Sequence, residues 1–167
     1  DSSSTWGAGI YNEGRSTVAG VSTPSPSFSE AKPSVNNCII ATNTLSTSGL
    51  KTSAFGAGIY NHSEAIIITT YFTPSFYTDT SDGTSKAELS ILNSTLYKNQ
   101  ASASAAYSGG THNLSIGDSS ATGITKYTNT ILWGNKSNAV LNDFFEEKTV
   151  DATYSAFSTT APLGTGN

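Results

Sequence analysis

Apolar residues along this chain alternate with polar ones or stand in short branched runs, and neither arrangement has the spacing of a helix. Ala87–Ile91 alternates with a period of two, as does Leu114–Ile116, while Ile66–Thr70 is a continuous β-branched run. Both patterns are typical of β-strands. Only residues 139–148 have a composition that allows a helical turn or two. The chain is therefore predicted to be all-β.

Two copies of one six-residue motif, Gly-Ala-Gly-Ile-Tyr-Asn, lie at Gly7–Asn12 and Gly56–Asn61. Each copy follows an aromatic residue, Trp6 or Phe55. A degenerate third copy at Tyr107–Asn113 keeps the order of aromatic, small, Gly, β-branched, ring and Asn residues. We call this the Gly-rich motif. Repetition at a spacing of about 50 residues is typical of proteins that coil into a solenoid.

A second pattern, here called the Asn motif, places two Asn residues six positions apart around a branched aliphatic residue. Each of its copies follows a copy of the Gly-rich motif. Asn tolerates the left-handed backbone conformation of a bend, and its amide can bond the Asn of the next coil. The terminal Asn residues of the three copies are therefore predicted to form a structural ladder: Asn37 and Asn43, Asn93 and Asn99, and Asn129 and Asn135.

The two motifs together predict a solenoid of short parallel strands, with Ile40, Leu96 and Leu132 stacked inward at one repeat position. One unit of about 50 residues is expected to make two coils of roughly 20 residues each. Segments 23–33 and 73–85, rich in Pro, Ser and Thr, are predicted to be inserted loops that project from one face. We expect residues 1–167 to form a single domain and to be part of a longer secreted chain.

Composition narrows the classes of partner. Ser and Thr number 27 and 24, whereas only 12% of the residues are charged, against about 25% in an average domain. With eight basic and 12 acidic residues the chain has no basic stripe for a phosphate backbone, so we predict no nucleic-acid partner. The longest apolar run is far below the roughly 18 residues of a membrane helix, so no membrane span is predicted.

The repeats resemble those of bacterial right-handed parallel β-helix surface proteins of the pectin-lyase-like superfamily. The likeness is to polymorphic-membrane-protein-type repeats and to choice-of-anchor extracellular proteins, in which a Gly-Gly-Gly-Ile-Tyr-Asn element precedes Phe-x-x-Asn. Gly56–Asn61 matches the first element, while Leu96–Asn99 and Leu132–Asn135 match the second with Leu in place of Phe. The resemblance implies a right-handed parallel β-helix of several coils, located outside the cell or on the bacterial cell surface.

Enzymes of this superfamily use clustered carboxylates with an Arg or Lys partner, and the same resemblance leaves a polysaccharide lyase or hydrolase open as an alternative. None of the six Asp residues occupies a matched repeat position, and Arg15 is the one guanidinium. No catalytic residue is therefore predicted, and a non-enzymatic role is favoured. A groove that brings two carboxylates near Arg15 or a Lys would support the enzyme.

Asp79 and Asp82, in the run Asp-Thr-Ser-Asp-Gly, are the candidate ligands of a Ca²⁺ ion, because turns rich in carboxylates and hydroxyls suit this cation. Their spacing is not that of an EF-hand. An exposed polar turn explains the same residues, and no other cofactor is predicted.

Outward aromatic residues are the candidate ligand-binding groups. If Leu96 and Leu132 point inward, strand alternation turns Tyr97 and Trp133 outward at equivalent positions. Tyr11 and Tyr60 form a second aligned pair beside the inward Ile10 and Ile59. Rings on a face of low charge suit stacking on sugars. The leading hypothesis is an adhesin, stalk or glycan-binding surface whose partners are glycans or other surface proteins; end-to-end self-association into a filament is a further alternative.

Overall fold

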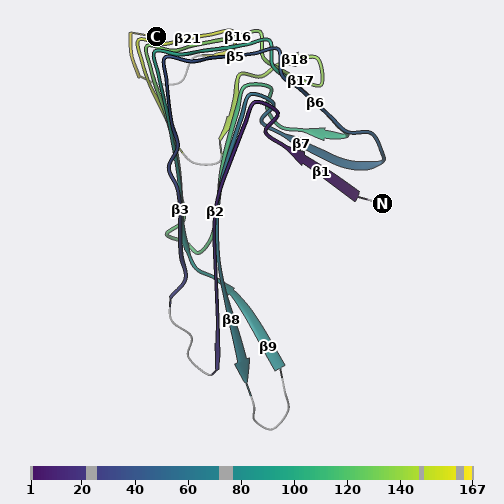
Figure 1. The fold of residues 1–167 in the computed structure, drawn as a ribbon, viewed down its shortest axis with the longest axis vertical. Helices are drawn as coiled ribbons and strands as arrows, with labels where there is room; N and C mark the ends of the chain where they lie inside the picture. The colour runs from purple at the N-terminus through teal and green to yellow at the C-terminus, as the bar shows by residue number, and fades with distance from the viewer. Residues whose placement is uncertain (1, 22–25, 72–76, 147–148, 161–163, 167) are drawn as a thin grey trace.

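The computed structural model describes residues 2–21, 26–71, 77–146, 149–160 and 164–166 (Figure 1). All regular structure in these ranges is β-strand, which confirms the all-β prediction. The prediction that residues 139–148 allow a helical turn or two is wrong for the described part of that segment. It forms two short strands instead, β18 (Val140–Leu141) and β19 (Phe144–Glu146). The described residues include no helix that is long and apolar enough to cross a membrane.

The chain runs through five sheets, here called sheets A to E, and passes through all five in this order three times. The last passage visits sheets B, C and D and then returns to sheet C. Sheet A contains β1 (Ser2–Trp6), β7 (Lys51–Phe55) and β13 (Ala105–Ala106). Sheet B contains β2 (Ile10–Val21), β8 (Ile59–Tyr71), β14 (Thr111–Ile116) and β19, with β9 (Tyr77–Asp82) antiparallel to β8. Sheet C contains β3 (Phe28–Ala31), β4 (Ser34–Asn36), β10 (Thr84–Leu92), β15 (Thr122–Thr128), β20 (Thr149–Thr153) and β22 (Gly164–Thr165).

Two smaller sheets complete each turn at the upper end of the molecule in Figure 1. Sheet D contains β5 (Ile39–Ala41), β11 (Thr95–Tyr97), β16 (Ile131–Trp133) and β21 (Ala156–Phe157). Sheet E contains β6 (Thr44–Ser46), β12 (Gln100–Ser102), β17 (Lys136–Ser137) and β18, which pairs antiparallel with β17. Apart from β9 and β18, neighbouring strands within each sheet are parallel.

One repeat unit makes one turn, so the expected two coils per unit are wrong. The Gly-rich motif opens sheet B, where Ile10 pairs with Ile59 and Ile59 pairs with Thr111. The Asn motif covers sheet D, where Ile40 pairs with Leu96 and Leu96 with Leu132. The two motifs therefore lie in different sheets of the same turn. Long strands such as the 13-residue β8 account for the length of the unit without a second coil.

The predicted inward ladder forms the centre of the core. Ile40 is 8% exposed, and Leu96 and Leu132 are fully buried. They belong to one apolar cluster with Val35, Ile59, Leu89, Ile91, Tyr127 and Ala152. Away from this cluster sheets B and C lie so close that small side chains fill the interior, and hydroxyls meet across it at Ser29–Ser63 (2.9 Å) and Ser85–Ser115 (2.5 Å).

The predicted Asn ladder forms in full at the second Asn of each motif and only in part at the first. Asn43 Nδ2 donates to Asn99 Oδ1 and Asn99 Nδ2 donates to Asn135 Oδ1, both at 2.9 Å. At the other end of the motif Asn37, Asn93 and Asn129 all have left-handed φ angles, between 48° and 54°. Asn129 bonds Asn93 there, although Asn93 bonds Asn36 rather than Asn37.

The described parts of the predicted inserted loops contain strands. Residues 23–25 and 73–76 lie outside the described residues. Segment 23–33 contains β3, which pairs with β10, and segment 73–85 contains β9 and the start of β10. β8 and β9 form an antiparallel arm at the lower end of the molecule (Figure 1).

Candidate functional site

Tyr97 and Trp133 lie side by side on the outer surface of sheet D. They pair in register across β11 and β16, and the fully buried Leu96 and Leu132 before them fix their outward direction. Trp133 is 53% exposed and Tyr97 is half-buried. Lys98 Nζ lies 4.8 Å from the centre of the Tyr97 ring, close enough for a cation–π contact.

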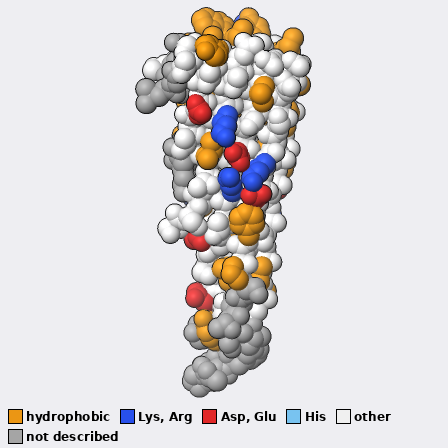
Figure 2. Space-filling view, turned by 90° about the vertical axis from the view of Figure 1, so that its left-hand side faces the viewer, with side chains coloured by type: hydrophobic (Ala, Val, Ile, Leu, Met, Phe, Trp, Pro, Cys, Tyr) orange, Lys and Arg blue, Asp and Glu red, His pale blue; other side chains and the backbone are white. Residues whose placement is uncertain are grey.

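The surface around these rings carries no charged side chain at the outward positions of the four strands. Ile39 is 81% and Ile131 is 48% exposed, although both are branched aliphatics. The outward positions are Ile39 and Ala41, Thr95 and Tyr97, Ile131 and Trp133, and Ala156. We call this surface the apolar face. Hydrophobic side chains gather at the same end of the molecule in Figure 2.

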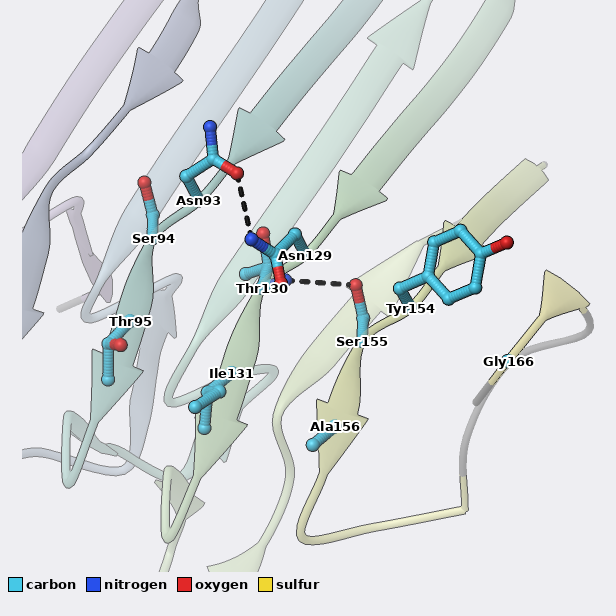
Figure 3. Close-up of a pocket in the computed structure, with 10 residues that line it drawn as sticks. All are labelled: Asn93, Ser94, Thr95, Asn129, Thr130, Ile131, Tyr154, Ser155, Ala156 and Gly166. Atoms are coloured by element: carbon cyan, nitrogen blue, oxygen red, sulfur yellow. Dashed lines mark hydrogen bonds between the residues drawn. The ribbon is translucent and has the colours of Figure 1, made fainter.

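A polar hollow adjoins the apolar face at the corner between sheets C and D (Figure 3). Hydroxyls and amides line it, and Thr95, Ile131 and Ala156 belong to both surfaces. Asn129 Nδ2 donates to Asn93 Oδ1 at 2.9 Å, and the Thr130 N–H donates to Ser155 Oγ at 3.1 Å. The remaining lining residues are Ser94, Tyr154 and Gly166. The hollow therefore offers fixed, uncharged hydrogen-bonding groups next to exposed rings.

Tyr11 and Tyr60 pair in register as predicted, but only Tyr11 is exposed. Tyr11 is 47% exposed, whereas Tyr60 is 3% exposed, so the prediction of an open aromatic pair is wrong for Tyr60. Sheet A covers this part of sheet B, and the Phe55 ring lies 5.8 Å from that of Tyr60. On its flanks Tyr60 contacts Tyr11 at 5.7 Å and His112 at 5.4 Å between ring centres.

Beside Tyr11 the outer surface of sheet B forms a charged groove of about 440 Å³, within the range of small-ligand pockets. Its residues are Trp6, Tyr11, Glu13, Arg15, Tyr60, His62 and Glu64. Arg15 Nη2 lies 2.7 Å from Glu64 Oε2, and the Tyr11 hydroxyl donates to Glu13 Oε2 at 2.7 Å. In this groove Arg15 is therefore paired with Glu64, while Glu13 is the hydrogen-bond partner of Tyr11.

Burial and neighbours set the protonation states in the groove. Burial, followed by the hydrogen bond to Glu13, raises the pKa of Tyr11 to about 12. Burial lowers the pKa of His62, against the opposing effect of Glu64 and Glu13. His62 Nδ1 lies 3.7 Å from Glu13 Oε1, but a neutral imidazole makes no ion pair there. At neutral pH the groove therefore presents a neutral imidazole at His62 beside the Arg15–Glu64 ion pair.

Sequence reasoning missed Glu13, His62 and Glu64 as members of a site. They can be found by continuing the alignment of the two motif copies past the six residues that are identical. Counting onward by two from Tyr11 and Tyr60 pairs Glu13 with His62 and Arg15 with Glu64, as the structure does. Extending the alignment of the Gly-rich motif at period two predicts this row of outward side chains.

Asp79 and Asp82 are both exposed on β9 and pair with Thr69 and Ile66 of β8. Side chains three positions apart on a strand point to opposite faces, so β9 does not bring these two predicted Ca²⁺ ligands together. In the part of the chain that the structure describes, no three His, Cys, Asp or Glu side chains are grouped as metal ligands.

No family model, curated protein or solved structure matches the chain. The features that bear on its function are therefore the apolar face, the adjoining hollow and the charged groove.

Proposed function

We propose that the chain is a right-handed parallel β-helix module, of the kind found in pectin-lyase-like surface proteins, that binds glycans outside the cell or on the bacterial cell surface. Repeated passage through the same five sheets in the same order supports the β-helix. Right-handed crossovers are the strong preference for parallel strands. The role is that of an adhesin or glycan-binding stalk rather than an enzyme.

The observation that carries the glycan-binding proposal is the apolar face. Trp133 and Tyr97 stand in register on a surface whose outward strand positions are uncharged and include the exposed Ile39 and Ile131. Lys98 lies at its border, against the Tyr97 ring. Exposed apolar patches on soluble proteins mark interaction sites. Aromatic rings combine a large apolar area with a fixed orientation, which suits the apolar faces of pyranose rings.

The polar hollow of Figure 3 favours sugars over a purely apolar partner. Its hydroxyl and amide groups come from Ser94, Asn129 and Ser155, which hydrogen bonds between turns already hold in place. A glycan that stacks on the apolar face can place its hydroxyls in this hollow, since both surfaces share Thr95 and Ile131. The absence of charged groups among the residues lining the hollow favours a neutral polysaccharide.

Binding to insoluble cellulose and chitin, with soluble polygalacturonate as the acidic comparison, tests the proposal. We expect Trp133→Ala to weaken binding to a neutral polysaccharide by about tenfold or more, a loss of roughly 1.4 kcal/mol. Phe28→Ala is the matched control, because Phe28 is a 56% exposed ring on sheet C, away from the apolar face. Equal binding by wild type and Trp133→Ala contradicts the proposal, as does equal loss in both variants.

The charged groove supports a second candidate, the polysaccharide lyase or hydrolase, because Glu13, Glu64 and Arg15 line it together. In this function one carboxylate acts as the general acid or base and Arg15 stabilises negative charge. Turnover of neutral or acidic polysaccharides that falls in both Glu13→Gln and Glu64→Gln would establish the enzyme. Turnover that is absent in wild type, or unchanged in both variants, rejects it.

A further inference from the structure

The arm formed by β8 and β9 has an edge along β9 to which no described residue is paired. β9 lies antiparallel to β8 at the lower end of the molecule, with Asp82 opposite Ile66 and Tyr77 opposite Tyr71 (Figure 1). Residues 78–82 are all exposed, whereas the positions of β10, which follows, alternate between half-buried and buried. Both faces of β9 and one of its edges are therefore open.

This edge is open because the later turns cross from sheet B to sheet C before they reach it. β9 lies on the same side of β8 as β14, which pairs with β8 only as far as Ile116. The third turn crosses at Gly83, where the Asp118 N–H donates to Gly83 O at 2.8 Å. In the fourth turn sheet B is described up to Glu146, and sheet C begins at Thr149. The level beside β9 belongs to these two turns, so the fold itself leaves the edge uncovered.

Hydrogen bonding fixes which backbone groups point to the open edge. The Gly83 N–H donates to Ala65 O at 2.9 Å, so Gly83 faces β8. Backbone groups alternate in direction along an antiparallel strand, and the pairing with β8 runs through β9 without a bulge. The N–H and C=O groups of Thr78, Thr80 and Asp82 therefore point away from β8. They form a row of donors and acceptors to which an extended peptide can add as a further strand.

The side chains of β9 indicate which kind of strand fits. Asp79 and Asp82 are the only charged residues among residues 65–85, and residues 16–21 of the neighbouring β2 have none. The ion pairs found among the described residues do not include either carboxylate. Being three positions apart, the two side chains point to opposite faces of β9. An added strand pairs with both if it carries two basic residues three positions apart.

We propose that β9 binds an extended, basic segment of another protein by strand addition, antiparallel to β9 and with basic side chains opposite Asp79 and Asp82. A second copy of this chain does not fit the edge, because two β9 strands centred on Thr80 bring the carboxylates of both copies together without a cation. Charged residues on an edge strand prevent pairing between identical chains. The same charges attract a strand of opposite sign. The inference does not depend on glycan binding.

A labelled hexapeptide, Thr-Lys-Thr-Val-Lys-Thr, is the probe, because antiparallel pairing sets its lysines opposite Asp82 and Asp79. Fluorescence anisotropy measures its binding to the 167-residue chain. We expect it to bind about tenfold or more tightly than the peptide with Glu in place of both lysines, and to bind more weakly as salt rises. Asp79→Asn and Asp82→Asn should each weaken binding about threefold. Asp151→Asn is the matched control, because Asp151 is an exposed carboxylate on β20, outside the arm.

Thr80→Pro tests the backbone pairing. It removes an N–H that points to the open edge, where proline is tolerated, so it should abolish peptide binding and leave β9 paired with β8. Hydrogen exchange gives a direct measurement: with peptide bound, the amides of Thr78, Thr80 and Asp82 should gain protection, while those of Asp79 and Ser81, which face β8, change little.

Circular dichroism confirms that each variant has folded, and the two Asp variants test the proposal without a change to the backbone. Equal binding of the basic and acidic peptides overturns the proposal, as does binding that neither Thr80→Pro nor the Asp variants weaken. A wild-type dimer that Thr80→Pro dissociates would assign the edge to a second copy and so reject a basic partner.

Discussion

Asn99 shows how one amide holds three turns together. Its Oδ1 accepts from Asn43 Nδ2, and its Nδ2 donates both to Asn135 Oδ1 and to Ile40 O, all at 2.9 Å. The side chain is fully buried, so water cannot replace any of these bonds. Asn is suited to this position because it carries a donor and an acceptor on one short side chain.

Asn99→Ala is therefore expected to lower the free energy of unfolding by roughly 2–4 kcal/mol, since a buried polar group left without a partner costs about 1–3 kcal/mol. Urea denaturation followed by fluorescence measures the change. Asn93→Gly is the matched control: Asn93 is exposed and has a φ of 48°, which Gly accepts. A loss in Asn93→Gly as large as that in Asn99→Ala would show that burial of the ladder is unimportant.

Thr42 carries a local strain that its counterparts in other turns reduce or avoid. Its φ is 56°, and the φ of its counterpart Lys98 is 52°. At the third equivalent position Gly134 has a φ of 68°. A β-branched residue is the least suited to this conformation. We expect Thr42→Gly to stabilise the protein by about 1 kcal/mol. Thr44→Gly, at an exposed strand position of β6, should instead destabilise it; urea midpoints of both variants test the contrast.

At the scale of elements, sheet A packs on sheet B through a layer of rings. His112 is 1% exposed and stacks on Phe145 at 4.9 Å, with Phe55 edge-on at 5.3 Å. Neither of its ring nitrogens has a hydrogen-bond partner among the described residues. Burial lowers the pKa of His112 to about 4, so the ring is neutral and acts as one more aromatic in the layer.

Because of this lowered pKa, the free energy of unfolding of the protein depends on pH. A histidine whose pKa falls on folding binds more protons when unfolded, so its contribution is complete above about pH 6.5 and is lost as the pH falls toward 4. At 1.36 kcal/mol per pKa unit the loss from His112 is about 3 kcal/mol. His112→Phe keeps the packing and should remove most of this dependence when urea unfolding at pH 4.5 and pH 7 is compared. An unchanged pH dependence would exclude His112 as its source.

The all-β class and the parallel pairing of the strands were predictable at this scale, because the repeated motifs specify them. Alternation in Ala87–Ile91 predicted β10, and the Asn motif predicted the strands of sheet D and the bends beside them. The number of turns was not predictable from periodicity, since a long strand such as β8 and a pair of short ones can have the same β-branched composition. Phe28–Ala31 was assigned to a loop because Pro and Ser surround it.

The site was predictable only in part, because exposure depends on what covers a strand. The register and outward direction of Tyr97 and Trp133 followed from Leu96 and Leu132. The same reasoning turned Tyr60 outward, but it could not show that sheet A lies over it. The charged groove depends on residues that differ between repeats, so a search for identical positions does not detect it.

At the scale of the molecule, the large share of Ser and Thr has a structural use. Sheets B and C are close enough for hydroxyls to bond across the interior, as Ser29 and Ser63 do at 2.9 Å. Larger side chains are excluded there, and the main apolar cluster is confined to the part of each turn near sheet D. Hydrogen bonds across this narrow part of the interior therefore supplement the apolar burial of the main cluster.

Asp143 caps the buried Asn ladder, because its Oδ1 accepts from Asn135 Nδ2 and its Oδ2 accepts from the N–H groups of Ser158 and Thr159. Loss of this cap is expected to weaken the strands nearest to it first. In Asp143→Asn, one orientation of the amide sets its NH₂ against the N–H groups of Ser158 and Thr159, and the other sets it against Asn135 Nδ2. Either way donors face donors, so we expect a loss of about 2–4 kcal/mol in the free energy of unfolding. Asp151→Asn, at an exposed position of the same turn, should change it by less than about 0.5 kcal/mol.

Hydrogen exchange of Asp143→Asn locates the effect. Amides of β19, β20 and β21 should exchange faster than in wild type, while those of β8 and β10 in the second turn keep their protection, because the last turn opens without the turns beneath it. Faster exchange spread evenly over all turns would mean that the chain opens as one cooperative unit. Unchanged exchange in β19–β21 would mean that Asp143 does not cap the ladder.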